Sequence, residues 1–86
     1  MFTNDAIAHL TTLSQIACRT EKRGNAFRFR FRRTGLESLA GVNELVDMGL
    51  DVKVYTGSKI HSAVDGFWST RQSSKVRSYT VVEVAL

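Results

Sequence analysis

The residues best placed to do chemistry are the arginines within residues 25–33, Asn-Ala-Phe-Arg-Phe-Arg-Phe-Arg-Arg. Three of them alternate with three phenylalanines, and successive side chains of a strand point to opposite faces. The spacing therefore predicts a strand with one phenylalanine face and one arginine face. On a helix the same guanidinium groups would be spread around the axis and partly buried without partners. The phenylalanine face must cover a core, and the arginine face must meet water or an acidic ligand.

The arginine face predicts binding of anions, since guanidinium groups neutralise phosphates and nearby tyrosine rings stack on bases. The net charge of +4 is also concentrated, because residues 19–33 hold seven basic side chains and one acidic side chain. We therefore expect a surface that binds nucleic acid, either RNA or DNA, on the sheet face centred on Arg28, Arg30 and Arg32. The further candidates for this surface are Arg19, Lys22, Arg23, Arg33, Lys53, Tyr55, Lys75, Arg77 and Tyr79.

The same charge distribution supports a second hypothesis, in which the arginine face docks on an acidic surface of a larger protein. The acidic residues within 34–66 make the molecule electrically polar, and such molecules are steered onto complementary surfaces. Trp68, next to Phe67, is a typical anchor of protein interfaces, although the two aromatics can equally form a corner of the core. On this hypothesis the chain is a small regulator or inhibitor. A solvated arginine face that prevents aggregation of sheets, or that self-associates as a homodimer, is the remaining interpretation.

The sequence gives little support to catalysis. His61 and Asp65 are spaced to meet on a helix, and Cys18 and Ser62 are nucleophiles by type, but no spacing matches a known pairing of nucleophile and base. A third hypothesis, a basic RNase-type toxin, would use the arginines together with His61. Because His9 and His61 are too few for a dedicated metal site and no glycine-rich phosphate loop follows a strand, we expect no metal, no cofactor and no enzymatic activity.

The chain of 86 residues is long enough for one small domain, residues 1–86, with an ordinary hydrophobic content of 43%. Its single cysteine excludes an internal disulfide and fits a reducing compartment. The first residues lack the profile of a secretory signal, and no apolar run approaches the roughly 18 residues that span a bilayer. These observations predict a soluble, cytoplasmic protein.

Apolar residues at helical spacing predict a first helix over residues 4–22, with Thr3 or Asn4 as its N-cap and Gly24 as its end. The other predicted elements are strands at 25–33, 51–56 and 76–85, a short helix at 59–66 and an extended segment at 67–71.

A second helix is predicted to begin at the capping box Thr34-Gly-Leu-Glu37 and to end at Gly49, where Leu50 can fold back on Leu45. A strand, a helix and a strand in this order predict a right-handed crossover between two parallel strands. The loop at residues 72–74 can join the extended segment to the last strand as a hairpin. The expected fold is therefore an α/β (α+β) two-layer sandwich, order α-β-α-β-(α)-β, in which a mixed sheet of three or four strands carries helices on one face.

Overall fold

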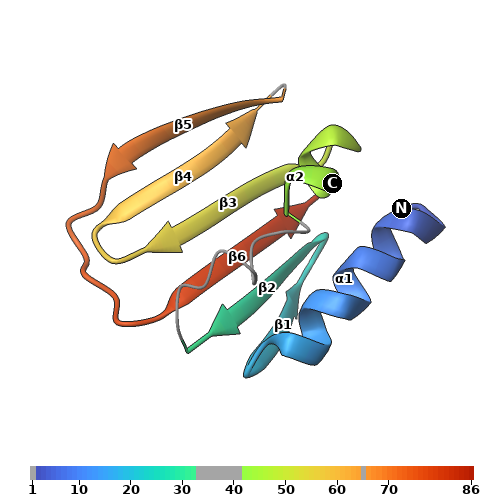
Figure 1. Cartoon of the computed structure of the whole chain (residues 1–86), viewed down its shortest axis with the longest axis horizontal. Helices are drawn as coiled ribbons and strands as arrows, with labels where there is room; N and C mark the ends of the chain where they lie inside the picture. Colours follow the sequence, from blue (N-terminus) through green and yellow to red (C-terminus); the bar gives the residue numbers. More distant parts are fainter. Residues whose placement is uncertain (1, 33–41, 65) are drawn as a thin grey trace.

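The computed structural model describes residues 2–32, 42–64 and 66–86, and within them six strands form one sheet in the order β1-β2-β6-β3-β4-β5 (Figure 1). Every pair of neighbouring strands in this sheet is antiparallel. The elements are α1 (Asn4–Ile16), β1 (Arg19–Arg23), β2 (Ala26–Phe31), α2 (Val42–Asp47), β3 (Asp51–Thr56), β4 (Lys59–Val64), β5 (Phe67–Gln72) and β6 (Thr80–Ala85).

The prediction of a mixed sheet of three or four strands is wrong. Both β2 and β3 pair antiparallel with β6, so they run in the same direction, as the crossover argument requires, but β6 separates them. A crossover fixes the relative direction of the two strands that it connects, but a later strand can still insert between them. The last strand of the chain therefore occupies the middle of the sheet (Figure 1).

The first helix is shorter than predicted, because α1 ends at Ile16 and residues Arg19–Arg23 form the edge strand β1. Gly24 was expected to end the helix, and it lies instead in the turn of the β1–β2 hairpin with a φ of 57°. A left-handed glycine serves a helix end and a tight hairpin turn equally well, so its presence does not distinguish the two. The backbone N–H of Cys18 donates to the carbonyl of Arg30 (2.8 Å), which continues the pairing of β1 with β2 beyond the strand.

The helix predicted at residues 59–66 is also wrong, since Lys59–Val64 forms strand β4, which pairs with β5 as a hairpin. Gly66, with a φ of 80°, lies at the turn between them, where its backbone conformation is accessible to few other residues. The predicted hairpin through residues 72–74 does not form, because β5 is the far edge of the sheet and β6 lies in its middle. The helix was predicted from four apolar residues at helical spacing, Ile60, Ala63, Val64 and Phe67. These are too few to outweigh the turn signals of Gly57 and Gly66 at the two ends.

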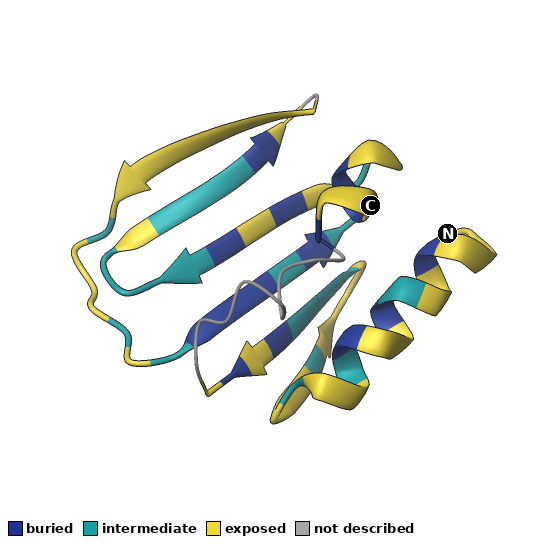
Figure 2. Ribbon diagram, viewed as in Figure 1, coloured by how far each residue is buried: buried dark blue, intermediate teal, exposed yellow. Residues whose placement is uncertain are grey.

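The core lies between the sheet and the two described helices, which pack on the same face (Figures 1 and 2). The predicted alternation in β2 is confirmed, since Phe29 and Phe31 are buried and Arg30 between them is exposed. Burying a side chain as large as phenylalanine contributes roughly 1.5–3 kcal/mol, so the phenylalanine face stabilises the packing of the helices on the sheet. The other buried members of the core are Ala6, Leu10, Leu13, Val42, Leu45, Val46, Val52, Val54, Ala63, Val82 and Val84.

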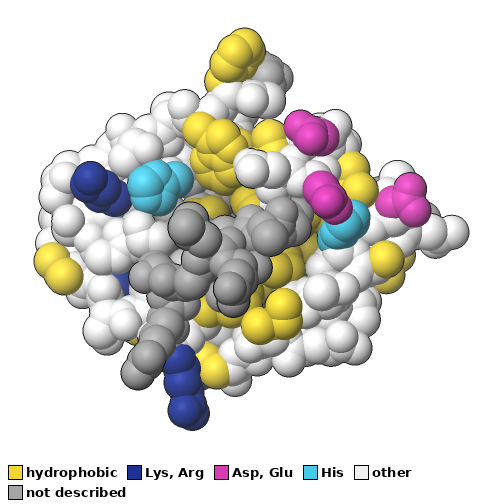
Figure 3. All heavy atoms as spheres, viewed as in Figure 1, with side chains coloured by type: hydrophobic (Ala, Val, Ile, Leu, Met, Phe, Trp, Pro, Cys, Tyr) yellow, Lys and Arg dark blue, Asp and Glu magenta, His cyan; other side chains and the backbone are white. Residues whose placement is uncertain are grey.

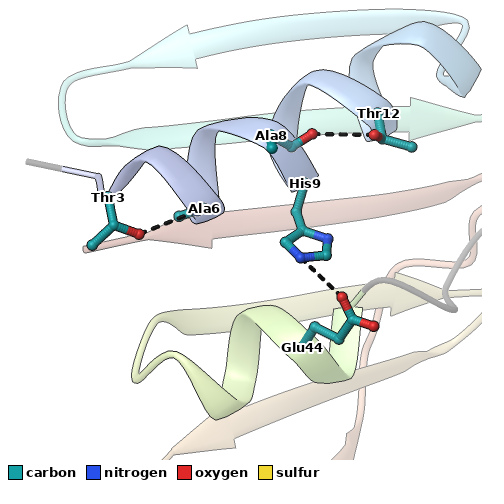
Figure 4. Close-up of polar contacts among 6 residues, drawn as sticks. All are labelled: Thr3, Ala6, Ala8, His9, Thr12 and Glu44. Carbon is teal, nitrogen blue, oxygen red and sulfur yellow. Dashed lines mark hydrogen bonds and ion pairs between the residues drawn. The ribbon is translucent and has the colours of Figure 1, made fainter.

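Two predicted helix-end signals are present: the N-cap of α1 and the glycine ending of α2. The Thr3 hydroxyl accepts from the N–H of Ala6 (3.2 Å) at the start of α1 (Figure 4). At the end of α2, the N–H of Gly49 donates to Val46 (3.0 Å) and that of Leu50 to Leu45 (3.3 Å), which confirms the Schellman ending. The capping box and the first part of this predicted helix lie outside the described residues.

Among the described residues, a contact between an imidazole and a carboxylate joins the two helices. Nε2 of His9 in α1 lies 2.9 Å from Oε2 of Glu44 in α2 (Figure 4). Acidic side chains gather over the helices on this side of the molecule (Figure 3), as the predicted electrical polarity requires. In the described part of the chain, neither helix has the length and apolar character needed to cross a membrane.

Candidate binding surface

The side of the sheet away from α1 and α2 is called here the open face, because no described helix covers it. The strand register arranges its side chains in rows that run across the sheet. In the first row each residue is the pairing partner of the next: Glu21, Arg28, Glu83, Lys53, Ser62 and Ser69. The second row, called here the arginine row, consists in the same way of Arg19, Arg30, Val81, Tyr55, Ile60 and Arg71.

The two rows differ in how their positive charge is balanced. In the first row, Nε of Arg28 lies 3.4 Å from Oε2 of Glu83. Glu21 lies 2.9 Å from Nε of Arg19 and 3.7 Å from an Nη of Arg23, both measured to its carboxylate oxygens. The arginine row itself holds three arginines and no acidic residue. Because Glu21 pairs with Arg19, the arginines of this row that form no ion pair with a described residue are Arg30 and Arg71. Arg28, next to Glu83, contributes less positive charge to the open face than its place in the sequence indicates.

Two arginines on the open face lie flat on tyrosine rings. Cζ of Arg30 is 3.9 Å from the ring centroid of Tyr79, and Cζ of Arg77 is 4.9 Å from that of Tyr55. These cation–π contacts fix the guanidinium planes and shield Val81, which is buried although no helix covers it. One face of each tyrosine ring is thus occupied by an arginine. The two guanidinium groups differ in exposure, since Arg30 is exposed whereas Nη1 of Arg77 is buried without a hydrogen-bond partner among the described residues.

A shallow hollow lies at the end of the arginine row, next to the edge of the sheet. It is lined by side chains from the end of α1, from β1 and β2, and from the segment before β6, and it includes no carboxylate. We name it the arginine hollow, and its residues are Cys18, Arg19, Arg30, Arg32, Ser78 and Tyr79. Three guanidinium groups and two hydroxyl groups around one hollow supply the donors that a phosphate group requires.

The structure brings most of the predicted binding residues together on the open face. The residues that lie there are Arg19, Arg23, Arg28, Arg30, Arg32, Lys53, Tyr55, Arg77 and Tyr79. Lys75 is exposed in the segment between β5 and β6, and Arg33 lies outside the described residues. Arg71 was missed as a binding residue because the segment predicted as extended at 67–71 pairs with β4, and this register was not foreseen. Ser78 and Cys18 were missed because the hollow is formed by distant segments.

Two predicted members of the surface lie on the opposite side of the sheet. Lys22 pairs with Phe27, and its Nζ is 5.7 Å from the centroid of that ring. Lys22 was predicted to lie in a helix over 4–22, but it lies in strand β1. Because side chains alternate along a strand, Lys22 points to the side opposite to Arg19 and Arg23. Trp68 also faces the helix side, where its Nε1 donates to the side-chain oxygen of Asn43 in α2 (3.2 Å).

The candidate catalytic residues do not converge with the arginines. His61 pairs with the buried Val54 and so lies on the helix side, where its ring nitrogens contact the hydroxyls of Thr56 (3.1 Å) and Thr70 (2.9 Å). Ser62 lies on the open face, and the exposed thiol of Cys18 donates to the carbonyl of Arg30 (3.2 Å). Asp65 lies outside the described residues, so its predicted contact with His61 has no counterpart here.

No family model, curated protein or solved structure matches this chain. Its function must therefore be argued from the side chains themselves. Within residues 2–32, 42–64 and 66–86, no three histidine, cysteine or acidic side chains gather as a metal ion would require. The most distinctive feature of the described surface is the arginine row with the arginine hollow at its end.

Proposed function

We propose that this protein is a non-enzymatic binding protein that holds single-stranded nucleic acid, RNA or DNA, on its open face. The observation that carries this proposal is the arginine row, which has no acidic member and leads into a hollow lined by Arg19, Arg30 and Arg32. Guanidinium groups present several N–H donors in a planar fork that matches a phosphate group. The hollow anchors one phosphate, and the rest of the row follows the backbone of the strand.

The shape of the face favours a single strand over a duplex. Specific readout of duplex DNA uses a helix or a β-ribbon that enters the major groove, and the described helices both lie on the other side of the sheet. A sheet face binds a single strand by neutralising phosphates and by stacking bases on planar groups. Arg30, which is exposed and lies over the ring of Tyr79, offers such a planar group. Because such single strands occur mainly inside cells, the proposal also includes a cytoplasmic location.

A second candidate function is a small regulator or inhibitor that docks on an acidic protein surface. It is favoured by the exposed aromatics of β5, since Phe67 is 80% and Trp68 is 41% exposed. Exposed aromatic and arginine side chains are frequent anchors of protein interfaces. On this alternative the arginine row meets carboxylates of the target instead of phosphates.

The test is a charge reversal on each side of the sheet. Arg30→Glu removes the central arginine of the row, and Lys22→Glu makes the same change in charge on the adjacent strand but on the helix side. Binding of a fluorescently labelled single-stranded oligonucleotide is followed by anisotropy at several salt concentrations. We expect Arg30→Glu to weaken binding at least about tenfold and Lys22→Glu by less than about twofold. The slope of log K against log salt should fall by about 0.7 for each lost phosphate contact.

Two results would overturn the nucleic-acid proposal. If the two reversals weaken binding equally, the effect reflects net charge and not a surface. If the wild-type protein binds no oligonucleotide and retains one protein at near-equal stoichiometry from a nuclease-treated lysate, the regulator hypothesis replaces it. Far-UV circular dichroism of both variants checks that the fold is retained.

A further inference from the structure

Strand β5 is an edge of the sheet at which every residue from Phe67 to Gln72 is exposed. Its only pairing partner among the described residues is β4, so its outer side presents backbone N–H and C=O groups to solvent. An unpaired edge of this kind is a template for the addition of another strand.

The sequence of β5 carries few of the features that protect an edge. Phe-Trp-Ser-Thr-Arg-Gln contains no proline, no lysine and one charged residue, Arg71, and its aromatic residues and Thr70 favour strands. We propose that β5 pairs in antiparallel fashion with β5 of a second copy of this chain, around a twofold axis perpendicular to the sheet. The two six-stranded sheets then form one continuous sheet.

The side chains of β5 are compatible with self-pairing. Residues that face each other in an antiparallel pair point to the same side of the sheet, so a twofold axis of this kind must pass through a residue and not between two. An axis at Ser69 sets Phe67 opposite Arg71 of the second copy, and it sets Trp68 opposite Thr70. An axis at Thr70 sets Ser69 opposite Arg71. Neither arrangement places like charges opposite each other.

The axis at Ser69 is the better of the two. It uses the exposed ring of Phe67 twice, each time against a guanidinium group, and this pairing adds a cation–π contact on the open face. An axis at Thr70 leaves Phe67 beyond the paired residues. We therefore assign the axis to Ser69, the residue that would then face its own copy.

Such a dimer would also extend the proposed binding surface. A twofold axis perpendicular to the sheet keeps the open faces of both copies on the same side, so both arginine rows lie on one face of the dimer. With the axis at Ser69, the arginine row of each copy ends at Arg71 opposite Phe67 of the other copy, and the two rows are offset along the strands. This consequence for binding rests on the proposed function, whereas the dimer itself does not. The test below contains no nucleic acid, so the two proposals can fail separately.

The experiment uses two opposite charges at the axis. Ser69→Lys and Ser69→Glu each place like charges opposite each other in a homodimer, whereas an equimolar mixture of the two variants places opposite charges there. We measure molar mass by sedimentation equilibrium over a range of concentrations. The expected result is a dimer for the wild type, a dissociation constant raised at least about tenfold for each variant, and a restored dimer in the mixture.

Other outcomes would overturn the proposal. A wild-type protein that stays monomeric over the whole range refutes it, and so does a dimer that neither variant weakens. A dimer that Ser69→Glu strengthens and Ser69→Lys weakens overturns the axis at Ser69, since Arg71 would then face residue 69. Thr20→Lys, an added charge on the opposite edge strand, is the matched control and should leave the mass unchanged.

Discussion

The two edges of the sheet, β1 and β5, have the same exposed position and opposite chemistry. In β1 four of the five residues are charged, and Glu21 forms ion pairs with Arg19 and Arg23. In β5 one residue of six is charged, and two large aromatics are exposed. Charged side chains on an edge oppose the addition of another strand, and an edge without them permits it. By its side chains the β1 edge opposes the addition of a strand, whereas the β5 edge permits it.

The β1–β2 end and the β5 end of the sheet also differ in how far their large side chains are buried. Phe29 in β2, the neighbour of β1, is 1% exposed beneath the helix side, whereas Phe67 in β5 is 80% exposed. Figure 2 shows the buried residues concentrated in the central strands and in the inner faces of the helices, with β5 exposed along its length. Stability should therefore depend strongly on the β2 end of the sheet and weakly on the β5 end.

The largest expected effect tests this difference in packing. Phe29→Ala should lower the free energy of unfolding by about 3–5 kcal/mol, because it leaves a cavity in the core. Phe67→Ala should change it by less than about 0.5 kcal/mol at concentrations where the protein is monomeric. Urea denaturation followed by circular dichroism measures both. If Phe67→Ala lowers the free energy of unfolding as much as Phe29→Ala does, then β5 is packed in solution and the two ends of the sheet do not differ in packing.

An intermediate effect is expected at the hairpin turns that lead into the two edges. Gly24 in the β1–β2 turn and Gly66 in the β4–β5 turn have φ values of 57° and 80°, and an added Cβ meets no heavy atom within 4 Å at either position. Alanine at either position should therefore cost about 1–2 kcal/mol from backbone strain alone. Thermal unfolding of the two variants should give similar shifts. Clearly unequal shifts would show that the edges differ in their backbone as well as in their side chains.

The smallest expected effect concerns the contact between His9 and Glu44, which is an ion pair only when the imidazole is protonated. His9 and Glu44 are partly exposed, with side-chain exposures of 32% and 60%, and exposed pairs contribute about 0.2–1 kcal/mol. A double-mutant cycle with His9→Ala and Glu44→Ala should give a coupling free energy within this range, smaller at high salt. A coupling well above it that resists salt would mean that the pair fixes the position of α1 over the sheet.

Much of the local structure could be read from the sequence, and the arrangement of the sheet could not. The inward face of β2 and the Schellman ending at Gly49 follow from residues close together in the chain, and both predictions are confirmed. The segment predicted as a helix at 59–66 was misread because a short run of apolar residues fits a helix and a strand equally well, whereas the segment predicted as extended at 67–71 lies in strand β5. Pairing with β3 stabilises strand β4. The residues of β3 lie outside the segment 59–66, so the apolar pattern of that segment alone could not show this pairing.

The candidate site shows the same limit. The sequence alone identified Arg30 and Arg32 as exposed arginines on one side of a strand, because the period of a strand is a local property. It could not show that Glu83 would lie opposite Arg28 or that Lys22 would point to the other side, since both facts depend on pairing between strands.

The sequence by itself thus determined which side chains of β2 point inward and which point outward, through the alternation of phenylalanine and arginine. The tertiary structure alone decided that β6 would enter between β2 and β3, and so which residues share the arginine row. The physical reason is that alternation is set by the geometry of one chain segment. Register and strand order are set by hydrogen bonds and packing between segments far apart in the sequence.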